Sequence, residues 1–311
     1  MAKYDIAVLL VPKFSMIALY GAIEPLRVAN RFAGETFSWR FLSMDGEPVA
    51  ASNGIPVSVS GNLSAIGRPD MAVISASYEP EQGVQKPMLA ALRKLAHEKV
   101  LMAAMDTAPF LLAEAGVLDG YRATCHWESL PGFRESYPKV LAEQALYVTD
   151  RDRMSCAGGA AAIDMMLDWI GRLLGRPIAV TVADQLVHFR SMEQPGQARL
   201  PVAARFGTAD ARVLTILAAM EEQCEDPLDA EALAALGGIS QRQMERLFRR
   251  ELNRRPMEIY LALRLEKAER LLTYSQMSMR DVGLACGFSS LPLFSRSFRA
   301  KHGRPPSAFR A

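Results

Sequence analysis

The 311-residue chain has few cysteines and no long apolar run. Its cysteines stand at positions 125, 156, 224 and 286, form no Cys-X-X-Cys pair, and only Cys125 has a histidine beside it. This spacing argues against a disulfide scaffold and a metal site, so we expect no metal and no cofactor, and a reducing cytoplasm. No apolar stretch approaches the roughly 20 residues of a membrane span. The N-terminal segment has no clear signal-peptide cleavage site.

Net charge is small overall but unevenly divided along the chain. The sequence has 36 basic and 34 acidic side chains, a net charge of +2. Residues 240–311 hold 15 basic and 6 acidic side chains, a net charge of +9, which leaves −7 for residues 1–239. Thirteen of those 15 cations are arginines, whose guanidinium group forms paired hydrogen bonds with phosphate and guanine. A basic tail on an acidic body predicts a polyanionic partner for the tail.

The hydrophobic pattern predicts two domains. Across residues 1–190, short apolar runs alternate with helical segments, a pattern typical of an α/β domain with an open, flavodoxin-like parallel sheet. Residues 191–207 contain two prolines and two glycines with little periodicity, which predicts a linker. Residues 208–311 show only helical patterns, so the second domain is expected to be all-α.

The second domain contains an internal repeat with a shift of 50 residues. Each copy predicts a helix, a glycine turn at Gly238 or Gly287, and a second helix. We expect Ser240 to cap the first of these second helices, and Ser289 or Ser290 to cap the other. The shift aligns Arg246, Phe248, Arg249, Arg254 and Pro256 with Arg296, Phe298, Arg299, Arg304 and Pro306. The repeat therefore preserves both an apolar face and an arginine-bearing face.

A helix beginning at Pro256 separates the two copies. About 18 residues at ~1.5 Å each make a rod of about 27 Å. A rod of that length can hold two helices about one turn of B-DNA apart, ~34 Å, on one side of the duplex. One chain is thus predicted to contact two successive major-groove segments of double-stranded promoter DNA.

Residues from about 208 to 311 resemble the AraC-type DNA-binding domain, above all in ISQRQMERLFRREL, RLEKAERLL and DVGLACGFSSLPLFSRSFRAKHGRPPSAFR. In that family the second helix of each unit enters the major groove. The resemblance implies base contacts from Arg242, Glu245, Arg246, Leu291, Pro292, Ser295 and Arg296. It implies phosphate contacts from Ser240, Gln241, Arg249 and Arg299. Ser290 is the twelfth residue predicted to contact DNA. Since Leu291 and Pro292 have no side-chain donor, the second helix is expected to use thymine methyl contact and Arg296.

A plainer interpretation of these arginines is a solvated helical face. Arg254, Arg255 and Arg304 fit either role. Arg264 and Arg270 are interpreted as partners of acidic residues along the helix that begins at Pro256.

A strand, a sharp turn and a helix are predicted around Asp106, at the edge where open α/β sheets bind ligands. KVLMAAMDTAPFLLAEAGVLDGYRATCHWE and MSCAGGAAAIDMMLDWI, within residues 3–190, resemble the PfpI branch of the class I glutamine amidotransferase-like superfamily. Its pairing with an AraC-type tail resembles the GlxA-like regulators. Catalytic relatives carry cysteine where this chain has Asp106, a poor acyl-transfer nucleophile that we expect to stay ionised beside the helix N-terminus.

The resemblance also matches His126 to a family histidine, with Glu24 as the nearest candidate for an acidic partner. A Cys125–His126 dyad is disfavoured because neighbours on an extended segment point in opposite directions. No catalytic residue is therefore predicted. Asp106 also fits the role of a cap for the helix that starts near Pro109, His126 that of an ordinary hydrogen-bonded histidine, and Trp127 that of a core residue.

These observations predict a ligand-responsive transcriptional regulator, an activator rather than a repressor, acting as a homodimer with RNA polymerase as a further partner. Its effector pocket is expected to be formed by Asp106, Thr107, His126 and Trp127, with Tyr78 or Tyr20. A carboxylate with an aromatic wall suits an amino compound or a quaternary ammonium ion, and the resemblance implies nitrogenous effectors too. The alternatives are a PfpI-like hydrolase or amidase fused to a DNA-binding module, and a constitutive DNA-binding protein whose α/β domain serves only dimerisation.

Overall fold

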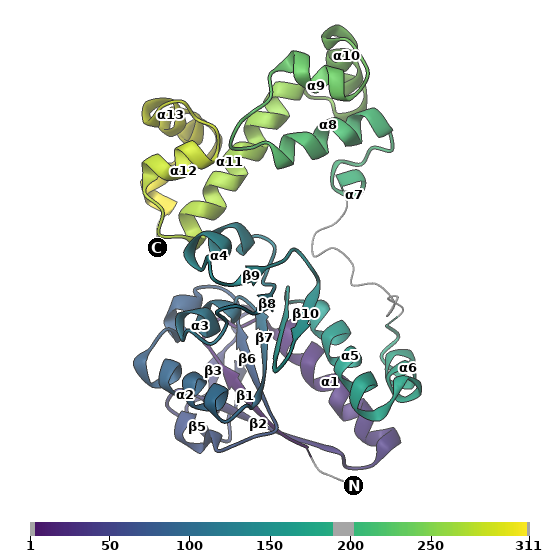
Figure 1. Ribbon diagram of the computed structural model, residues 1–311, viewed down its shortest axis with the longest axis vertical. Helices are drawn as coiled ribbons and strands as arrows, with labels where there is room; N and C mark the ends of the chain where they lie inside the picture. Colours follow the sequence, from purple (N-terminus) through teal and green to yellow (C-terminus); the bar gives the residue numbers. More distant parts are fainter. Residues whose placement is uncertain (1–3, 189–201, 310–311) are drawn as a thin grey trace. The chain divides into compact units, whose positions relative to one another are not determined.

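A computed structural model describes residues 4–188 and 202–309. The chain divides into two compact units, Met1–Ala198 and Arg199–Ala311 (Figure 1). The first unit has a core between its sheet and helices, and the second has two smaller cores of its own.

The first unit is built on a seven-stranded sheet in the order β10-β11-β7-β6-β1-β2-β5. Its neighbouring strands run parallel except β10 and β11, which pair antiparallel. The strands are β1 (Tyr4–Leu10), β2 (Phe37–Ser43), β5 (Gly61–Asn62), β6 (Met71–Ala76), β7 (Leu101–Asp106), β10 (Tyr147–Asp150) and β11 (Arg153–Cys156). This sheet confirms the predicted α/β class. Sequence reasoning missed β10 and β11 because they are short and lack a continuous apolar run.

Helices cover both faces of this sheet. In Figure 1, α1, α5 and α6 lie on one side, and α2 and α3 lie on the other. The helices are α1 (Met16–Ala33), α2 (Lys86–His97), α3 (Pro109–Glu114), α4 (Leu130–Ser136), α5 (Ala161–Leu174) and α6 (Arg176–Gln185), with 3-10 turns η1 (Leu63–Ile66) and η2 (Pro80–Gly83). Two small sheets pair β3 (Val49–Ala50) with β4 (Pro56–Val57) and β8 (Arg122–Ala123) with β9 (Leu141–Ala142).

Within residues 202–309 of the second unit, helices joined by turns and loops make up the secondary structure, with no strand. It comprises α7 (Val202–Phe206), α8 (Ala211–Glu222), α9 (Ala230–Leu236), α10 (Gln241–Leu252), α11 (Pro256–Tyr274), α12 (Met279–Ala285), α13 (Leu291–His302) and η3 (Pro306–Phe309). One core joins α8, α9 and α10 to the first half of α11, as far as Leu263. The other joins α12 and α13 to its second half, from Leu265. The sequence predicted this helix between the two copies, and the structure shows that the single 19-residue helix also contributes to both cores.

The predicted linker, residues 191–207, contains one helix. Its first part, residues 191–201, lies outside the described residues. Within the remainder, α7 forms, and its Val202 and Phe206 pack against the core of the first helix-turn-helix unit. The guanidinium of Arg205 also pairs with the carboxylate of Glu221 on α8 at 2.5 Å. A five-residue helix is too short to show a clear periodicity, which is why the sequence did not reveal it.

Candidate nucleic-acid interface and effector site

The second helix of each repeat starts from a serine cap. The Ser240 hydroxyl accepts the backbone N–H of Gln243 at 3.3 Å, and the Gln243 side chain accepts the Ser240 N–H at 2.8 Å, so α10 begins with a capping box. The Ser290 hydroxyl accepts the N–H of Leu293 at 3.4 Å at the start of α13. Of the two serines considered for α13, Ser290 is therefore the cap. Both caps place the helix starts at equivalent positions of the repeat.

Each of these helices buries an apolar face and leaves its arginines in solvent. α10 buries Met244, Leu247 and Phe248, and α13 buries Phe294 and Phe298. Of the twelve predicted DNA contacts only Ser295 is half-buried, and the other eleven are exposed: Ser240, Gln241, Arg242, Glu245, Arg246, Arg249, Ser290, Leu291, Pro292, Arg296 and Arg299.

The arginines of these two faces are available for a polyanion. Within residues 202–309, no carboxylate pairs with Arg242, Arg246 or Arg296. By contrast, Arg250 pairs with Glu251 at 2.8 Å. Arginines on one exposed face without acidic partners are what phosphate and guanine recognition requires.

The two helix-turn-helix units are joined by contacts that the sequence did not reveal. Arg264 on α11 donates to the carbonyl oxygens of Cys286 at 2.8 Å and Gly287 at 2.6 Å, and its guanidinium lies 4.5 Å from the Phe288 ring centroid. The prediction that Arg264 pairs with acidic residues is therefore wrong. Its partners are carbonyls because the turn after α12 packs against this part of α11. These bonds fix the second unit to the shared helix.

Gly287 also contacts the first helix-turn-helix unit. Its φ is +72°, and a Cβ there would lie 2.4 Å from Cγ of Pro227 and 2.7 Å from the carbonyl oxygen of Cys224. The second turn thus rests directly on the loop between α8 and α9. This contact, with the Arg264 bonds, holds α10 and α13 in one fixed relation.

In the first unit, Asp106 ends β7 at the predicted corner. Its φ is +62°, uncommon for a residue other than glycine, and it is 7% exposed. The Ser77 hydroxyl donates to the Asp106 carboxylate at 3.1 Å, and the Thr107 hydroxyl donates to the Ser77 carbonyl at 2.5 Å. On the other side, a Cβ on Gly158 would lie 2.6 Å from the same carboxylate oxygen. The carboxylate is therefore enclosed between Ser77 and the Gly158–Gly159 turn.

The segment after β8 brings two more predicted residues to this corner. The His126 backbone N–H donates to the Asp106 carbonyl at 3.0 Å, and the imidazole centroid lies 5.7 Å from that of Trp127. The His126 Nδ1 lies 3.8 Å from a carboxylate oxygen of Glu128. The structure thus gathers Asp106, Thr107, His126 and Trp127 around one end of β7.

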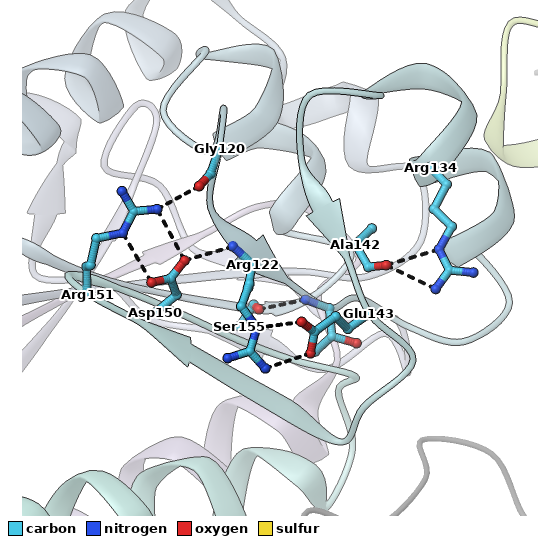
Figure 2. Close-up of polar contacts among 9 residues, drawn as sticks. Gly120, Arg122, Arg134, Ala142, Glu143, Asp150, Arg151 and Ser155 are labelled. Atoms are coloured by element: carbon cyan, nitrogen blue, oxygen red, sulfur yellow. Dashed lines mark hydrogen bonds and ion pairs between the residues drawn. The ribbon is translucent and has the colours of Figure 1, made fainter.

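A polar network anchors the strands that carry this segment (Figure 2). Arg122 pairs with Glu143 across β8 and β9 at 2.9 Å, and its backbone N–H donates to Asp150 at 2.9 Å. The Thr124 N–H donates to the Ser155 hydroxyl at 2.8 Å, which ties the segment to β11. Arg134 on α4 donates twice to the Ala142 carbonyl. Because these polar groups bond to one another within the protein, we interpret them as structural contacts that hold the segment carrying His126 and Trp127 in place.

A cleft of about 400 Å³ opens beside the start of α1. It is lined by Ser15, Met16, Ile17, Tyr20, Ser52 and Asn53. None of the four residues predicted to form the effector pocket, Asp106, Thr107, His126 and Trp127, lines this cleft. Tyr20, one of the two tyrosines considered as an addition, does line it. A Cβ on Gly21 would lie 3.5 Å from the Gly159 carbonyl oxygen, so the Gly158–Gly159 turn separates Asp106 from α1. The other optional residue, Tyr78, is exposed and lines no part of this cleft.

Comparison with known proteins identifies the family. The chain matches the DJ-1/PfpI family over residues 6–171 and a helix-turn-helix domain over residues 233–311. It is 43% identical over 307 residues to the HTH-type transcriptional regulator CdhR of Pseudomonas aeruginosa, covering 99% of this chain and 91% of that protein. It is 34% identical over 308 residues to the HTH-type transcriptional regulator GlxA of Rhizobium meliloti, covering 98% and 95%. The chain belongs to the AraC-type transcriptional regulators that carry a DJ-1/PfpI domain.

Two further matches agree with this family. The HTH-type transcriptional regulator GbdR of Pseudomonas aeruginosa is 35% identical over 303 residues, covering 97% of this chain and 83% of that protein. The crystal structure of an AraC family transcriptional regulator from Pseudomonas putida aligns with a TM-score of 0.55 and 27% identity, covering 59% of this chain and 99% of that chain. The predicted family, fold class and role in DNA-binding regulation are confirmed.

As a member of the AraC-type regulators, the chain shares its architecture with named regulators, which supports the predicted non-enzyme role. The Cys125 thiol contacts the His126 carbonyl oxygen at 3.6 Å rather than its ring, and burial raises its pKa. Glu24 pairs with Arg27 on the surface of α1 at 2.6 Å, so it is no acidic partner for His126. Throughout 4–188 and 202–309 no group of side chains suits a metal ion, and no helix is long and apolar enough to cross a bilayer.

Two expectations for Asp106 are wrong. Burial raises the pKa of Asp106 to about 7, further raised by the charge of Glu128 and opposed by the Ser77 hydrogen bond, so the group is not fully ionised at neutral pH. Nor does Asp106 cap α3, whose N-cap is Ala108 with no side-chain hydrogen bond. Enclosure by Ser77 and Gly158 removes the Asp106 carboxylate from water, which disfavours its charged form. The dipole of the six-residue helix α3 does not offset this loss of solvation.

Sequence reasoning missed several residues of these sites. Ser77 follows β6, and nothing local marks it as the hydrogen-bond partner of a residue 29 positions away. Pro227 and Cys224 likewise face Gly287 only through the tertiary fold. Gly158 and Gly159 were visible in the sequence as a glycine pair, a signal for close backbone approach that could have identified the turn over Asp106.

Proposed function

We propose that this regulator is an activator controlled by a small nitrogenous cation, an amino or quaternary ammonium compound, bound near Asp106. Residues 1–190 would form the sensing and dimerisation domain, residues 191–207 the linker, and residues 208–311 the DNA-binding domain. The observation that carries the effector class is the buried Asp106 carboxylate at a corner where the His126 backbone N–H bonds the Asp106 carbonyl and the His126 and Trp127 rings adjoin each other. A buried carboxylate near an aromatic ring favours a cation over a neutral or anionic ligand.

Binding of a cation would change the charge state of Asp106. With a pKa of about 7, the Asp106 carboxyl is partly protonated at neutral pH. A positive charge beside it would favour the ionised form. A metabolite that binds one arrangement of the two domains more tightly increases the population of that arrangement. In this way it can control promoter occupancy or contact with RNA polymerase. A homodimer held by the first domain would double the DNA contacts. The protein acts in the cytoplasm under this proposal.

The effector class is tested with choline and its uncharged carbon isostere, 3,3-dimethyl-1-butanol, by calorimetry at pH 8. Choline is expected to bind at least about tenfold more tightly than the isostere, because the difference is one charge facing Asp106. Asp106→Asn should remove this difference, while Glu135→Gln, an exposed carboxylate on α4, should preserve it. Since choline has no titrating ammonium proton, its affinity should fall between pH 8 and pH 6 as Asp106 protonates.

Equal affinity of Asp106→Asn and the natural chain for choline would remove Asp106 from the effector site. Burial lowers the pKa of His126, and His126→Gln should keep the pH dependence if Asp106 is the group that titrates.

The assignment of base contacts is tested by Arg246→Ala and Arg296→Ala. Each should weaken specific DNA binding by ~1–3 kcal/mol and relax the base preference at neighbouring positions. The measurement is competition of specific and random duplexes by fluorescence anisotropy at one salt concentration. Arg250→Ala, whose guanidinium pairs with Glu251, is the control and should change specificity little. Equal losses on specific and random DNA would make the two arginines phosphate contacts instead.

A further inference from the structure

The two DNA-facing helices start with side chains of opposite character. Both begin immediately after a serine cap, Ser240 or Ser290, and Met244 and Phe294 are buried at the same step of each helix. The first turn of α10 is Gln241, Arg242 and Gln243, whereas that of α13 is Leu291, Pro292 and Leu293. Equivalent positions thus carry hydrogen-bonding groups in one helix and none in the other. We call residues 291–293 the α13 tip.

The α13 tip is exposed in the protein. Leu291 is 44% exposed and Leu293 is 41% exposed, and Pro292 is exposed as well. The core of this unit is supplied by other residues, among them Phe294 and Phe298, which are fully buried. Three consecutive apolar residues that keep over two-fifths of each leucine exposed at a helix start form a small apolar patch, which favours a contact outside this helix-turn-helix unit.

The occupant is indicated by the arginines next to the tip. Arg296 and Arg299 follow on the exposed side of α13 at the positions of Arg246 and Arg249 in α10, and Arg296 has no acidic partner within residues 202–309. Positive charge on the same side of the helix favours a polyanion over an apolar protein surface. In the major groove the one apolar group on a base edge is the C5-methyl of thymine.

We propose that the two units read different chemistry: α10 reads hydrogen-bonding groups on base edges, and the α13 tip reads thymine C5-methyl groups. This inference rests on the proposed function and deepens it. The half-site under α13 is then rich in thymine at the positions that face Leu291 and its two neighbours. Leu293 joins Leu291 and Pro292 as a residue that determines specificity.

The test replaces thymine by deoxyuridine, which keeps every hydrogen-bonding group and removes only the methyl. The full chain first selects its operator from random duplexes, and the half-site of each helix is assigned by the loss of protection in Arg246→Ala and Arg296→Ala. Deoxyuridine in the α13 half-site should weaken binding about fourfold per contacted methyl, the value for burying one methyl-sized group. The same replacement in the α10 half-site should change affinity less than twofold.

Leu291→Ala distinguishes direct contact from altered DNA shape. It should weaken binding to the thymine operator and reduce the loss caused by deoxyuridine at the position that faces Leu291, while the effect at positions that face Pro292 and Leu293 remains. Leu261→Ala, an exposed leucine on α11, is the matched control and should retain the full preference for thymine. A deoxyuridine effect of undiminished size in Leu291→Ala would mean that DNA shape, not Leu291, carries it, and would overturn the inference.

Three outcomes separate this inference from the function beneath it. A chain that selects no sequence from random duplexes would fail as a specific DNA-binding regulator altogether. A chain that selects an operator but is indifferent to deoxyuridine under α13 would remain a regulator without methyl readout. If, in addition, Leu291→Ala leaves DNA affinity unchanged, the α13 tip makes no contact with DNA and the inference is overturned.

Discussion

Gly287→Ala is expected to destabilise the DNA-binding unit by about 2–4 kcal/mol. The residue needs a φ of +72°, which costs an L side chain roughly 1 kcal/mol. Its Cβ would also overlap Pro227 and the Cys224 carbonyl, and overpacking of this kind costs about 1–3 kcal/mol more. Since the overlap pushes the second turn away from the first helix-turn-helix unit, specific DNA binding should fall further than random binding.

Gly238→Ala provides the matched control. Gly238 occupies the equivalent turn with a φ of +66°, but nothing lies within 4 Å of its added Cβ. It should therefore cost only the conformational term, about 1 kcal/mol. The three tryptophans, Trp39, Trp127 and Trp169, all lie in the first unit, so helical circular dichroism in urea must follow the second unit. Equal destabilisation by the two substitutions would show that Gly287 does not hold the units together.

Asp106→Asn is expected to stabilise the first unit at pH 8. The pKa of Asp106 in the folded protein is about 7, above the ordinary value near 4 of the unfolded chain. The native chain therefore loses stability as the pH rises from about 4 to about 7, and the loss is complete above pH 7. At about 1.36 kcal/mol per pH unit the difference reaches about 4 kcal/mol, an upper limit that Asn removes because it carries no charge. Asparagine also tolerates the positive φ of this position.

The measurement is urea unfolding at pH 4, 6 and 8, followed by tryptophan fluorescence. The stabilities of the natural chain and Asp106→Asn should coincide near pH 4 and separate progressively toward pH 8. Glu135→Gln should run parallel to the natural chain throughout, because its side chain is exposed. A constant gap between Asp106→Asn and the natural chain at all three pH values would show that Asp106 does not titrate as its burial implies.

The two predictions for Asp106 point to function rather than packing. If Asp106→Asn both stabilises the protein and abolishes the preference for choline, the carboxylate is retained at a cost in stability. Such a cost is common where a ligand needs a charge in a poorly solvated place.

The second domain was readable from sequence because its signals are local. The 50-residue repeat, the serine caps and the apolar face of each helix lie within about a dozen residues of one another, and helical periodicity exposes them. Ser289 and Ser290 could not be separated, since either can precede a helix, and the N–H bond to Leu293 decides for Ser290.

The amino-acid sequence by itself therefore determined the family, the two-domain plan, the sheet class and the arginine-bearing faces of α10 and α13. Only the tertiary structure decided the charge state of Asp106, the carbonyl partners of Arg264 and the contact between Gly287 and Pro227. The reason is physical: helix periodicity and capping depend on near neighbours, whereas burial and close approach depend on segments such as Ser77 and Asp106, which lie 29 residues apart. Such contacts form only in the folded chain and correspond to no pattern in the local sequence.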